Sequence, residues 1–429
     1  MKNKFNRFLR ILGPGLITGA ADDDPSGIAT YSQAGAQFGY GQLWTAVFML
    51  PFQTAVQEAC ARIGAVTGRG LIAVIRENYT KNIVSAAVIL VLIANTINIG
   101  ADLGAMAAAT QLLIPVNFTL LVVAFTVLVL ILEIFTSYKV YAQVLKWLAL
   151  ALLSYPVTVF MVNQPWNTLL RATFLPHFEL NFAFLFIITG VLGTTISPYM
   201  FFWQASEEIE EEKEKHLKIG HMDSNVLRRF INNLRLDTAV GMLASEIGTW
   251  SIIVVAATVL NTHGVTDIKT SADAARALEP LVQTFPNSGF WAKFIFSVGI
   301  LGLGLLSVPV LSGSASYAVS EAFSWREGLN LKLKRAHGFY GVIIIATLVG
   351  LLINFIGIDP VRALVYTAVI NGVVAVPLLF LIGKIAQNEK IMGEYKSGAL
   401  SKALVWFTFV GMGAAAIAML YTMWQNGGL

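Results

Sequence analysis

The chain has 429 residues, of which 56% are apolar and 13% are charged, and its formal net charge is +4. Because soluble domains carry about 25% charged residues, this composition excludes a water-soluble enzyme, a nucleic-acid-binding protein and a fibrous protein. Apolar runs at 83–97, 118–135 and 405–424 have the polarity and length of bilayer spans, which need about 20 residues each. We therefore expect a multi-pass membrane protein with an all-helical fold.

Eleven spans are predicted from apolar windows that are interrupted by glycine, proline and charged residues. With the N-terminus inside, 24 lysines and arginines fall at cytoplasmic ends and 5 outside. Because basic loops resist translocation, this distribution predicts a cytoplasmic N-terminus and, with an odd number of spans, a C-terminus outside. The spans are expected near 11–36, 42–66, 83–111, 117–136, 141–162, 182–206, 233–260, 290–323, 338–356, 360–385 and 402–424.

Helix breakers lie near the middle of the first and the sixth span. Pro25 follows three aspartates in the first, and Pro198 follows a glycine- and threonine-rich turn in the sixth. Proline removes a backbone donor and clashes with the preceding turn. Each break opens a set of five spans, and discontinuous helices at matching places in two repeats are typical of inverted-repeat transporters. The predicted units are a cytoplasmic tail (1–10), a first repeat (11–162), an extracellular loop (163–181), a second repeat (182–385), and a cytoplasmic loop with the eleventh helix (386–429).

Three carboxylates, Asp22, Asp23 and Asp24, lie at the first break. An ionisable group at the bilayer centre costs at least about 2.5–3.5 kcal/mol, so it is a functional candidate. Unwound backbone carbonyls together with Asp24 would form an oxygen-rich, negative cavity that suits Mg²⁺, Ca²⁺ or Mn²⁺. The residues therefore predict cation transport with Asp24 as a direct ligand. The alternatives are a proline kink with no site and a carboxylate held by local backbone donors.

The first span and the turn after it contain three characteristic segments: Gly13-Pro14-Gly15-Leu16-Ile17, Asp24-Pro25-Ser26-Gly27 and Ala34-Gly35-Ala36-Gln37-Phe38-Gly39-Tyr40. They resemble the Nramp (natural resistance-associated macrophage protein) family of divalent-metal transporters, and the similarity continues through all eleven spans in number and order. The resemblance implies a leucine-transporter-like inverted repeat with broken helices 1 and 6, and alternating access. It also implies proton-coupled uptake of Mn²⁺ or Fe²⁺, with main-chain carbonyls of Ala21 and Thr194 at the site.

The two family motifs at the breaks are altered in this chain. The asparagine of the first-span motif falls on Gly27, which we expect to provide room and no ligand. The methionine of the sixth-span motif falls on Ser197, which would bind the ion through water or cap the second half-helix. The histidine falls on Tyr199, which would contact a hydration water or pack as an aromatic side chain.

Other helices also depart from the family pattern. The acidic pair of the third span is reduced to Asp102, with Ala105 in place of a glutamate. In the tenth span Ala368 replaces a glutamine, and Asn371 lies one turn further on, either as a ligand or as a link between helices. Without the histidine and the glutamate the family's proton relay is broken, so we expect weak or absent proton coupling, with Asp102 as the candidate coupling residue.

Loss of the thioether removes the preference for transition metals that depends on it. A strongly hydrated ion such as Mg²⁺, which dehydrates reluctantly, would fit the altered site, with Asp22 or Asp23 accepting hydrogen bonds from its water. Because consecutive helical residues face different sides, only one of these two is expected to point into the cavity. The chain thus resembles the Nramp-related magnesium-transporter branch, and the expected metal-site residues are Asp24, Ala21, Gly27, Thr194, Ser197, Tyr199, Asn371 and Asp23.

The hypothesis is a secondary transporter of Mg²⁺ first and Mn²⁺ second, without enzymatic activity or cofactor. We expect a monomer in a prokaryotic plasma membrane whose partners are the divalent ion and the lipid bilayer, with no nucleic acid. The alternatives are a proton-coupled Mn²⁺/Fe²⁺ importer of the ordinary Nramp type, an amino-acid or amine transporter of the same fold, and a non-transporting receptor. Two further expectations are an ion pair between Glu133 and Lys139 and a solvated loop that extends the sixth helix over the glutamates at 207–214.

Overall fold

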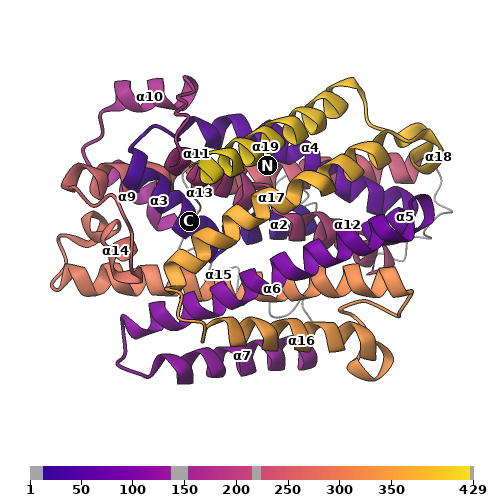
Figure 1. The fold of residues 1–429 in the computed structure, drawn as a ribbon, viewed down its shortest axis with the longest axis horizontal. Helices are drawn as coiled ribbons and strands as arrows, with labels where there is room; N and C mark the ends of the chain where they lie inside the picture. The colour runs from indigo at the N-terminus through magenta and orange to yellow at the C-terminus, as the bar shows by residue number, and fades with distance from the viewer. Residues whose placement is uncertain (1–12, 137–152, 215–223, 426–429) are drawn as a thin grey trace, which may run out of the picture.

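The computed structural model describes residues 13–136, 153–214 and 224–425, and within these ranges the chain forms helices and no strands (Figure 1). The helices are α2 (Pro14–Asp22), α3 (Pro25–Phe38), α4 (Trp44–Thr67), α5 (Leu71–Asn78), α6 (Lys81–Gln111), α7 (Phe118–Phe135), α9 (Ser154–Met161), α10 (Trp166–Phe174), α11 (Phe182–Thr195), α12 (Pro198–Glu214), α13 (Ser224–Val259), α14 (Ser271–Arg276), α15 (Ser288–Phe323), α16 (His337–Ile353), α17 (Pro360–Gln387), α18 (Glu389–Met392) and α19 (Ala399–Gln425).

Both predicted helix breaks are present. The first predicted span is divided into α2 and α3, and the sixth into α11 and α12. Pro25 occupies the first turn of α3, where a missing N–H is tolerated, and Pro198 begins α12. The two breaks therefore arise at the prolines from which they were predicted.

Seven of the described helices are long and apolar enough to cross a membrane, with α11 and α12 taken as one passage, and α16 is a shorter apolar helix. This number comes from length and composition alone. The count of eleven spans and the orientation of the termini remain predictions. Most of the fifth predicted span, 141–162, lies outside the described residues.

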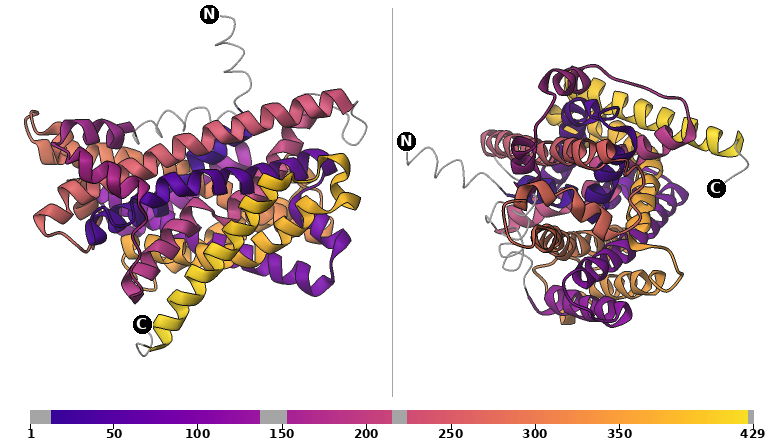
Figure 2. Two further views of the ribbon diagram at one scale, coloured as in Figure 1. Left: turned by 90° about the horizontal axis from the view of Figure 1, so that it is seen from above. Right: turned by 90° about the vertical axis from the view of Figure 1, so that its left-hand side faces the viewer.

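Packing between the helices repeats with the internal symmetry expected of an inverted repeat. The contact of α3 with α13 in one half corresponds to the contact of α12 with α4 in the other. In the same way, the contact of α6 with α7 corresponds to the contact of α15 with α16. Helices α6 and α15 cross the middle of the bundle, and α7 and α16 lie side by side at one edge (Figure 1). Helix α19 lies on the outside, against α17, α11 and α4 (Figure 2). The broken helices consequently meet at the centre.

Apolar side chains cover the outside of the bundle and charged side chains lie inside it, the reverse of a soluble protein. Large apolar side chains are exposed along α7 and α19, whereas Asp22, Asp24 and Asp102 are completely buried. Lipid tails can cover the apolar outer faces, but they offer no partner to a polar group. Polar side chains are therefore gathered inside the bundle, the aspartates of the first break among them.

The glutamates at 207–214 do not form the predicted solvated extension. The predicted span ends near 206, but helix α12 continues to Glu214, and Glu208, Glu210 and Glu212 are buried. Glu208 accepts a hydrogen bond from Gln204 (2.7 Å), and Glu210 accepts one from the backbone N–H of Leu329 (2.9 Å). Glu208 thus has a partner on its own helix and Glu210 has one distant in sequence, in place of water.

Glu133 accepts a hydrogen bond from the hydroxyl of Ser312 on α15 (2.5 Å). Its predicted partner, Lys139, lies outside the described residues, so that ion pair remains a prediction.

A seam of small residues joins α2 to α13. A β-carbon added to Gly15 would lie 2.6 Å from the backbone nitrogen of Thr238, and one added to Gly19 would lie 2.3 Å from the carbonyl oxygen of Gly241. Small residues at four-residue spacing let helix backbones approach closely in membranes. At the start of α2, the Asp237 carboxylate accepts hydrogen bonds from the backbone N–H groups of Gly13 (2.9 Å) and Gly15 (2.7 Å).

Replacing Gly19 with alanine is expected to destabilise the protein by about 1–3 kcal/mol, because the added methyl group overpacks this seam. Thermal melting of the detergent-purified protein, followed by intrinsic fluorescence, measures the effect. Gly411→Ala on α19 is the matched control, since a β-carbon there meets nothing within 4 Å. Equal melting temperatures for the two variants would contradict the close contact between α2 and α13.

Candidate metal-binding site

Asp24 lies in the break between α2 and α3, and its two carboxylate oxygens have different surroundings. Oδ1 accepts hydrogen bonds from the backbone N–H of Gly27 (2.8 Å) and the hydroxyl of Ser26 (2.6 Å), so it caps α3. Oδ2 accepts one from the amide of Asn98 on α6 (3.1 Å). Local donors thus hold one oxygen, while the other is contacted by a side chain from a neighbouring helix.

Tyr199 connects α12 to the first break. Its hydroxyl donates to the carbonyl oxygen of Ala21 (2.8 Å) and lies 3.4 Å from Asp24 Oδ2. The Ala21 carbonyl that was expected to be bare therefore already accepts one hydrogen bond, although a carbonyl oxygen has a second lone pair. Tyr199 is consequently placed beside the candidate ligands.

The Ser197 side chain forms hydrogen bonds with backbone carbonyl groups at the end of α11. Its hydroxyl donates to the carbonyl oxygens of Gly193 (2.7 Å) and Thr194 (2.8 Å). These carbonyls lie at the C-terminus of the first half-helix, and the expected cap on the second half-helix stays a prediction. The donated proton leaves the lone pairs of the Ser197 oxygen available to a water molecule or an ion.

Gly27 permits close packing and does not provide room for a ligand. A β-carbon at this position would lie 3.2 Å from the Thr194 hydroxyl and 3.2 Å from the ring of Tyr31. The missing side chain thus lets α3 approach the end of α11, and the expectation of open space here is wrong.

Asn371 on α17 lies beside the second break. The adjacent Gly372 and the nearby Ala368 contact Gly193 of α11 so closely that no β-carbon would fit on that glycine. Asn371 is buried, and neither atom of its amide has a hydrogen-bond partner among the described residues. An amide that linked helices would have one, so these unpaired atoms favour the role of a ligand.

Asn98 was not recognised as a site residue from the sequence. It lies one helical turn before Asp102 on α6, and polar residues at this spacing share a face. Asp102 accepts a hydrogen bond from Ser307 (2.6 Å) and interacts electrostatically with Asp24. Ala105 is packed among apolar residues. The available signal was a polar residue one turn from Asp102, but Asn95 and Thr96 are polar too, so the sequence did not single out Asn98.

Asp22 and Asp23 do not face different sides as expected. The hydroxyl of Ser245 on α13 donates to Asp22 and lies 3.4 Å from Asp23 Oδ1. The prediction assumed a continuous helix, but α2 ends at Asp22, and Asp23 has non-helical dihedrals (φ −84°, ψ 43°). Both carboxylates therefore face α13, on a different side from Asp24 Oδ2.

The charges around the break are not compensated by basic side chains. In the part of the chain that the structure describes, no lysine or arginine forms an ion pair with Asp22, Asp23, Asp24 or Asp102. No three histidine, cysteine, aspartate or glutamate side chains within the described ranges converge closely enough to hold a metal ion. The break thus attracts cations but does not chelate a bare ion with acidic groups alone.

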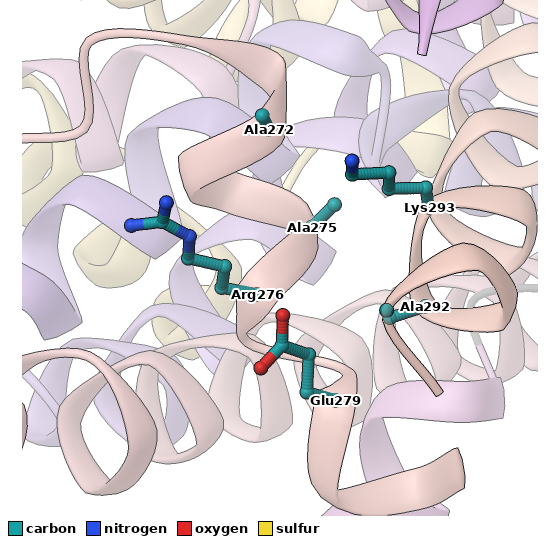
Figure 3. Close-up of a pocket in the computed structure, with 7 residues that line it drawn as sticks. Ala272, Ala275, Arg276, Glu279, Ala292 and Lys293 are labelled. Atoms are coloured by element: carbon teal, nitrogen blue, oxygen red, sulfur yellow. The ribbon is translucent and has the colours of Figure 1, made fainter. Parts of the chain in front are cut away.

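A peripheral pocket of about 210 Å³ differs in its chemistry (Figure 3). It lies between α14 and α15 and is lined by Arg276, Lys293 and Glu279, together with small residues. Its two basic side chains disfavour a cation, and none of its lining residues belongs to the break.

Comparison with known proteins identifies a family whose sequences match this chain. The family described as "Natural resistance-associated macrophage protein-like" matches residues 15–422. The divalent metal cation transporter MntH 1 of Pseudomonas aeruginosa is 26% identical over 423 residues, which cover 96% of this chain and 91% of the relative. The divalent metal cation transporter MntH of Chromohalobacter salexigens is 27% identical over 393 residues, 89% of this chain and 84% of the relative.

Solved structures resemble the fold at lower sequence identity. A manganese transporter of Eremococcus coleocola has a TM-score of 0.76 at 17% identity, over 98% of this chain and 88% of that one. Mhp1, a nucleobase-cation-symport-1 family transporter, has a TM-score of 0.59 at 14% identity, over 96% and 93% of the two chains. These similarities confirm the predicted all-helical, leucine-transporter-like fold, and the match over residues 15–422 shows that the chain belongs to the Nramp family.

Proposed function

We propose that this protein transports a divalent metal ion across the membrane by alternating access, with Mg²⁺ as its first substrate and Mn²⁺ as its second. The observation that carries the proposal is the fully buried Asp24 carboxylate in a helix break, without a basic partner among the described residues. Relatives over most of the chain are named divalent metal cation transporters, which supports the class of substrate.

The donor atoms support a hard ion. Around the break they are the Asp24 carboxylate, the Asn371 amide, the Tyr199 and Ser197 hydroxyls and main-chain carbonyls, and Ser197 replaces the family's thioether. Oxygen ligands suit Mg²⁺, Ca²⁺ and Mn²⁺, whereas a soft sulfur would favour later transition metals. Mg²⁺ keeps several waters, which fits a site where three acidic ligands do not converge.

Weak or absent proton coupling is the second part of the proposal. Tyr199 stands where the family has a histidine and donates its hydroxyl proton to a carbonyl, while Ala105 replaces a glutamate. Asp102 remains and is held by Ser307. Asp102 therefore lacks both the histidine and the glutamate that would continue the family's proton relay.

A proton-coupled Mn²⁺ importer is the second candidate, because the structural neighbour with a TM-score of 0.76 is named a manganese transporter. An amino-acid or amine transporter of the same fold is less favoured, since three adjacent aspartates would repel a substrate carboxylate. A non-transporting receptor would keep its function after Asp24 is replaced.

Flux into proteoliposomes tests the substrate and its ligands. Asp24→Asn is expected to lower both Mg²⁺ and Mn²⁺ uptake at least tenfold, because it removes the charge that neutralises the ion. Glu133→Gln is the matched control: it removes a buried carboxylate of α7 that contacts α15, and uptake should persist. Full activity of Asp24→Asn would contradict metal transport through this site.

Ser197→Met tests the selectivity. A restored thioether should shift the preference from Mg²⁺ towards Mn²⁺ or Cd²⁺ by about tenfold, equivalent to ~1.4 kcal/mol. The ratio of initial uptake rates for the competing ions measures this change. An unchanged ratio would show that position 197 does not contact the ion or its water.

Proton coupling is tested by a pH-sensitive dye inside the vesicles. We expect Mg²⁺ entry without acidification of the lumen beyond the passive leak of empty vesicles. Acidification that rises in proportion to metal uptake, and that disappears in Asp102→Asn, would instead establish the proton-coupled alternative.

A further inference from the structure

A second polar cluster lies on the other side of the break from Asp24 Oδ2, between α2, α4 and α13. Asp22 accepts hydrogen bonds from the amide of Gln53 on α4 and from the hydroxyl of Ser245 on α13. Asp23 packs against the same face of α13, because a β-carbon on Gly248 would lie 2.9 Å from Asp23 Oδ2. These two carboxylates are thus contacted from α4 and α13, whereas Asp24 Oδ2 is contacted from α6 and α12.

Glu246 adds a third carboxylate to this cluster. It follows Ser245 on α13, it is 4% exposed, and its electrostatic interactions are with Asp22 and Asp23. Neither of its carboxylate oxygens has a hydrogen-bond partner among the described residues, and none of the ion pairs in that part of the chain includes it. This buried glutamate, which interacts electrostatically with two aspartates, therefore lacks a hydrogen-bond donor in the described part of the chain.

Further unpaired atoms belong to the same three helices. Within the described ranges, Asp22 Oδ1, Gln53 Oε1 and both polar atoms of the Gln57 amide lack partners. Gln57 is fully buried and lies one turn after Gln53 on α4. A buried polar group without a partner costs about 1–3 kcal/mol, and such groups in native proteins are normally satisfied by water or ions.

The acidic side chains determine which kind of ligand this cluster can bind. Three carboxylates in a region of low dielectric repel one another unless a cation or protons neutralise them. They do not converge closely enough to coordinate a bare metal ion. An ion that keeps its water shell is wider, and its waters donate hydrogen bonds to carboxylate and amide oxygens. Mg²⁺ holds its waters most firmly among the common divalent ions of biology.

We propose that Asp22, Asp23 and Glu246 hold a second, hydrated divalent cation between α2, α4 and α13, separate from the ion at Asp24. This inference rests on the proposed function in that it assumes a divalent substrate. Tyr31 lies beside the new cluster: it hydrogen-bonds with Thr195 at the end of α11 (3.0 Å) and interacts electrostatically with both Asp22 and Asp23. The second ion neutralises the face of α2 that packs on α13.

Counting bound Mn²⁺ tests the proposal. The full-length protein in detergent is titrated with Mn²⁺, and the loss of the electron paramagnetic resonance signal of free Mn²⁺ gives the number of sites. Wild type is expected to bind two ions and Glu246→Gln one, with the lost site weakened at least tenfold. Glu133→Gln is the matched control, because it also removes a 4% exposed glutamate and should retain two ions.

Two further variants keep the outcome decisive. Asp23→Asn should lose the same site as Glu246→Gln and serves if that variant does not fold. Asp24→Asn should keep one Mn²⁺ ion. Pulsed electron paramagnetic resonance of this variant should detect the number of exchangeable protons that a nearly complete shell of water around the ion contains. Mg²⁺ should displace Mn²⁺ from both sites.

Each result separates the two proposals. One ion in wild type that is lost in Asp24→Asn and retained in Glu246→Gln overturns the second site and leaves the proposed function intact. One ion that is lost in Glu246→Gln and retained in Asp24→Asn supports the cluster and overturns the ligand assignment of Asp24. Two ions that persist in both Glu246→Gln and Asp23→Asn also overturn the second site.

Discussion

A membrane helix that stops halfway must satisfy its freed backbone groups inside the protein, because lipid offers no hydrogen-bond partner. The rest of the structure depends on how this is done. Asp24 caps α3 with one oxygen, the Ser197 hydroxyl binds the last carbonyls of α11, and Tyr199 binds the carbonyl of Ala21. The groups that stabilise the breaks are therefore the groups that would contact an ion, so the stability of the fold and the binding of the substrate are chemically linked.

Features that depend on local chemistry were predictable from the sequence. The breaks followed from Pro25 and Pro198, and the buried charge of Asp24 followed from its position in a span. The direction of the Ser197 hydroxyl was not predictable, because a serine at a break can bind the helix on either side of it. Asp22 and Asp23 were placed by the angular spacing of a helix that in fact ends between them.

Contacts between distant segments account for the other differences. Glu210 lies in a run of glutamates that resembles a solvated surface, yet its partners are more than a hundred residues away. Asn98 hydrogen-bonds Asp24 because α6 packs against the broken helix. Glu246 interacts with Asp22 and Asp23 because α13 packs there. A pattern along one helix predicts which residues share a face, but it does not identify the neighbour that this face will meet.

The Asp237 carboxylate opposes any movement of α2 away from α13. It holds two N–H groups at the first turn of that half-helix, next to a glycine contact that leaves no space for water. Moving α2 away from α13 would break both hydrogen bonds and open the glycine contact. One acidic side chain of α13 thus links the position of this half-helix to that of its neighbour.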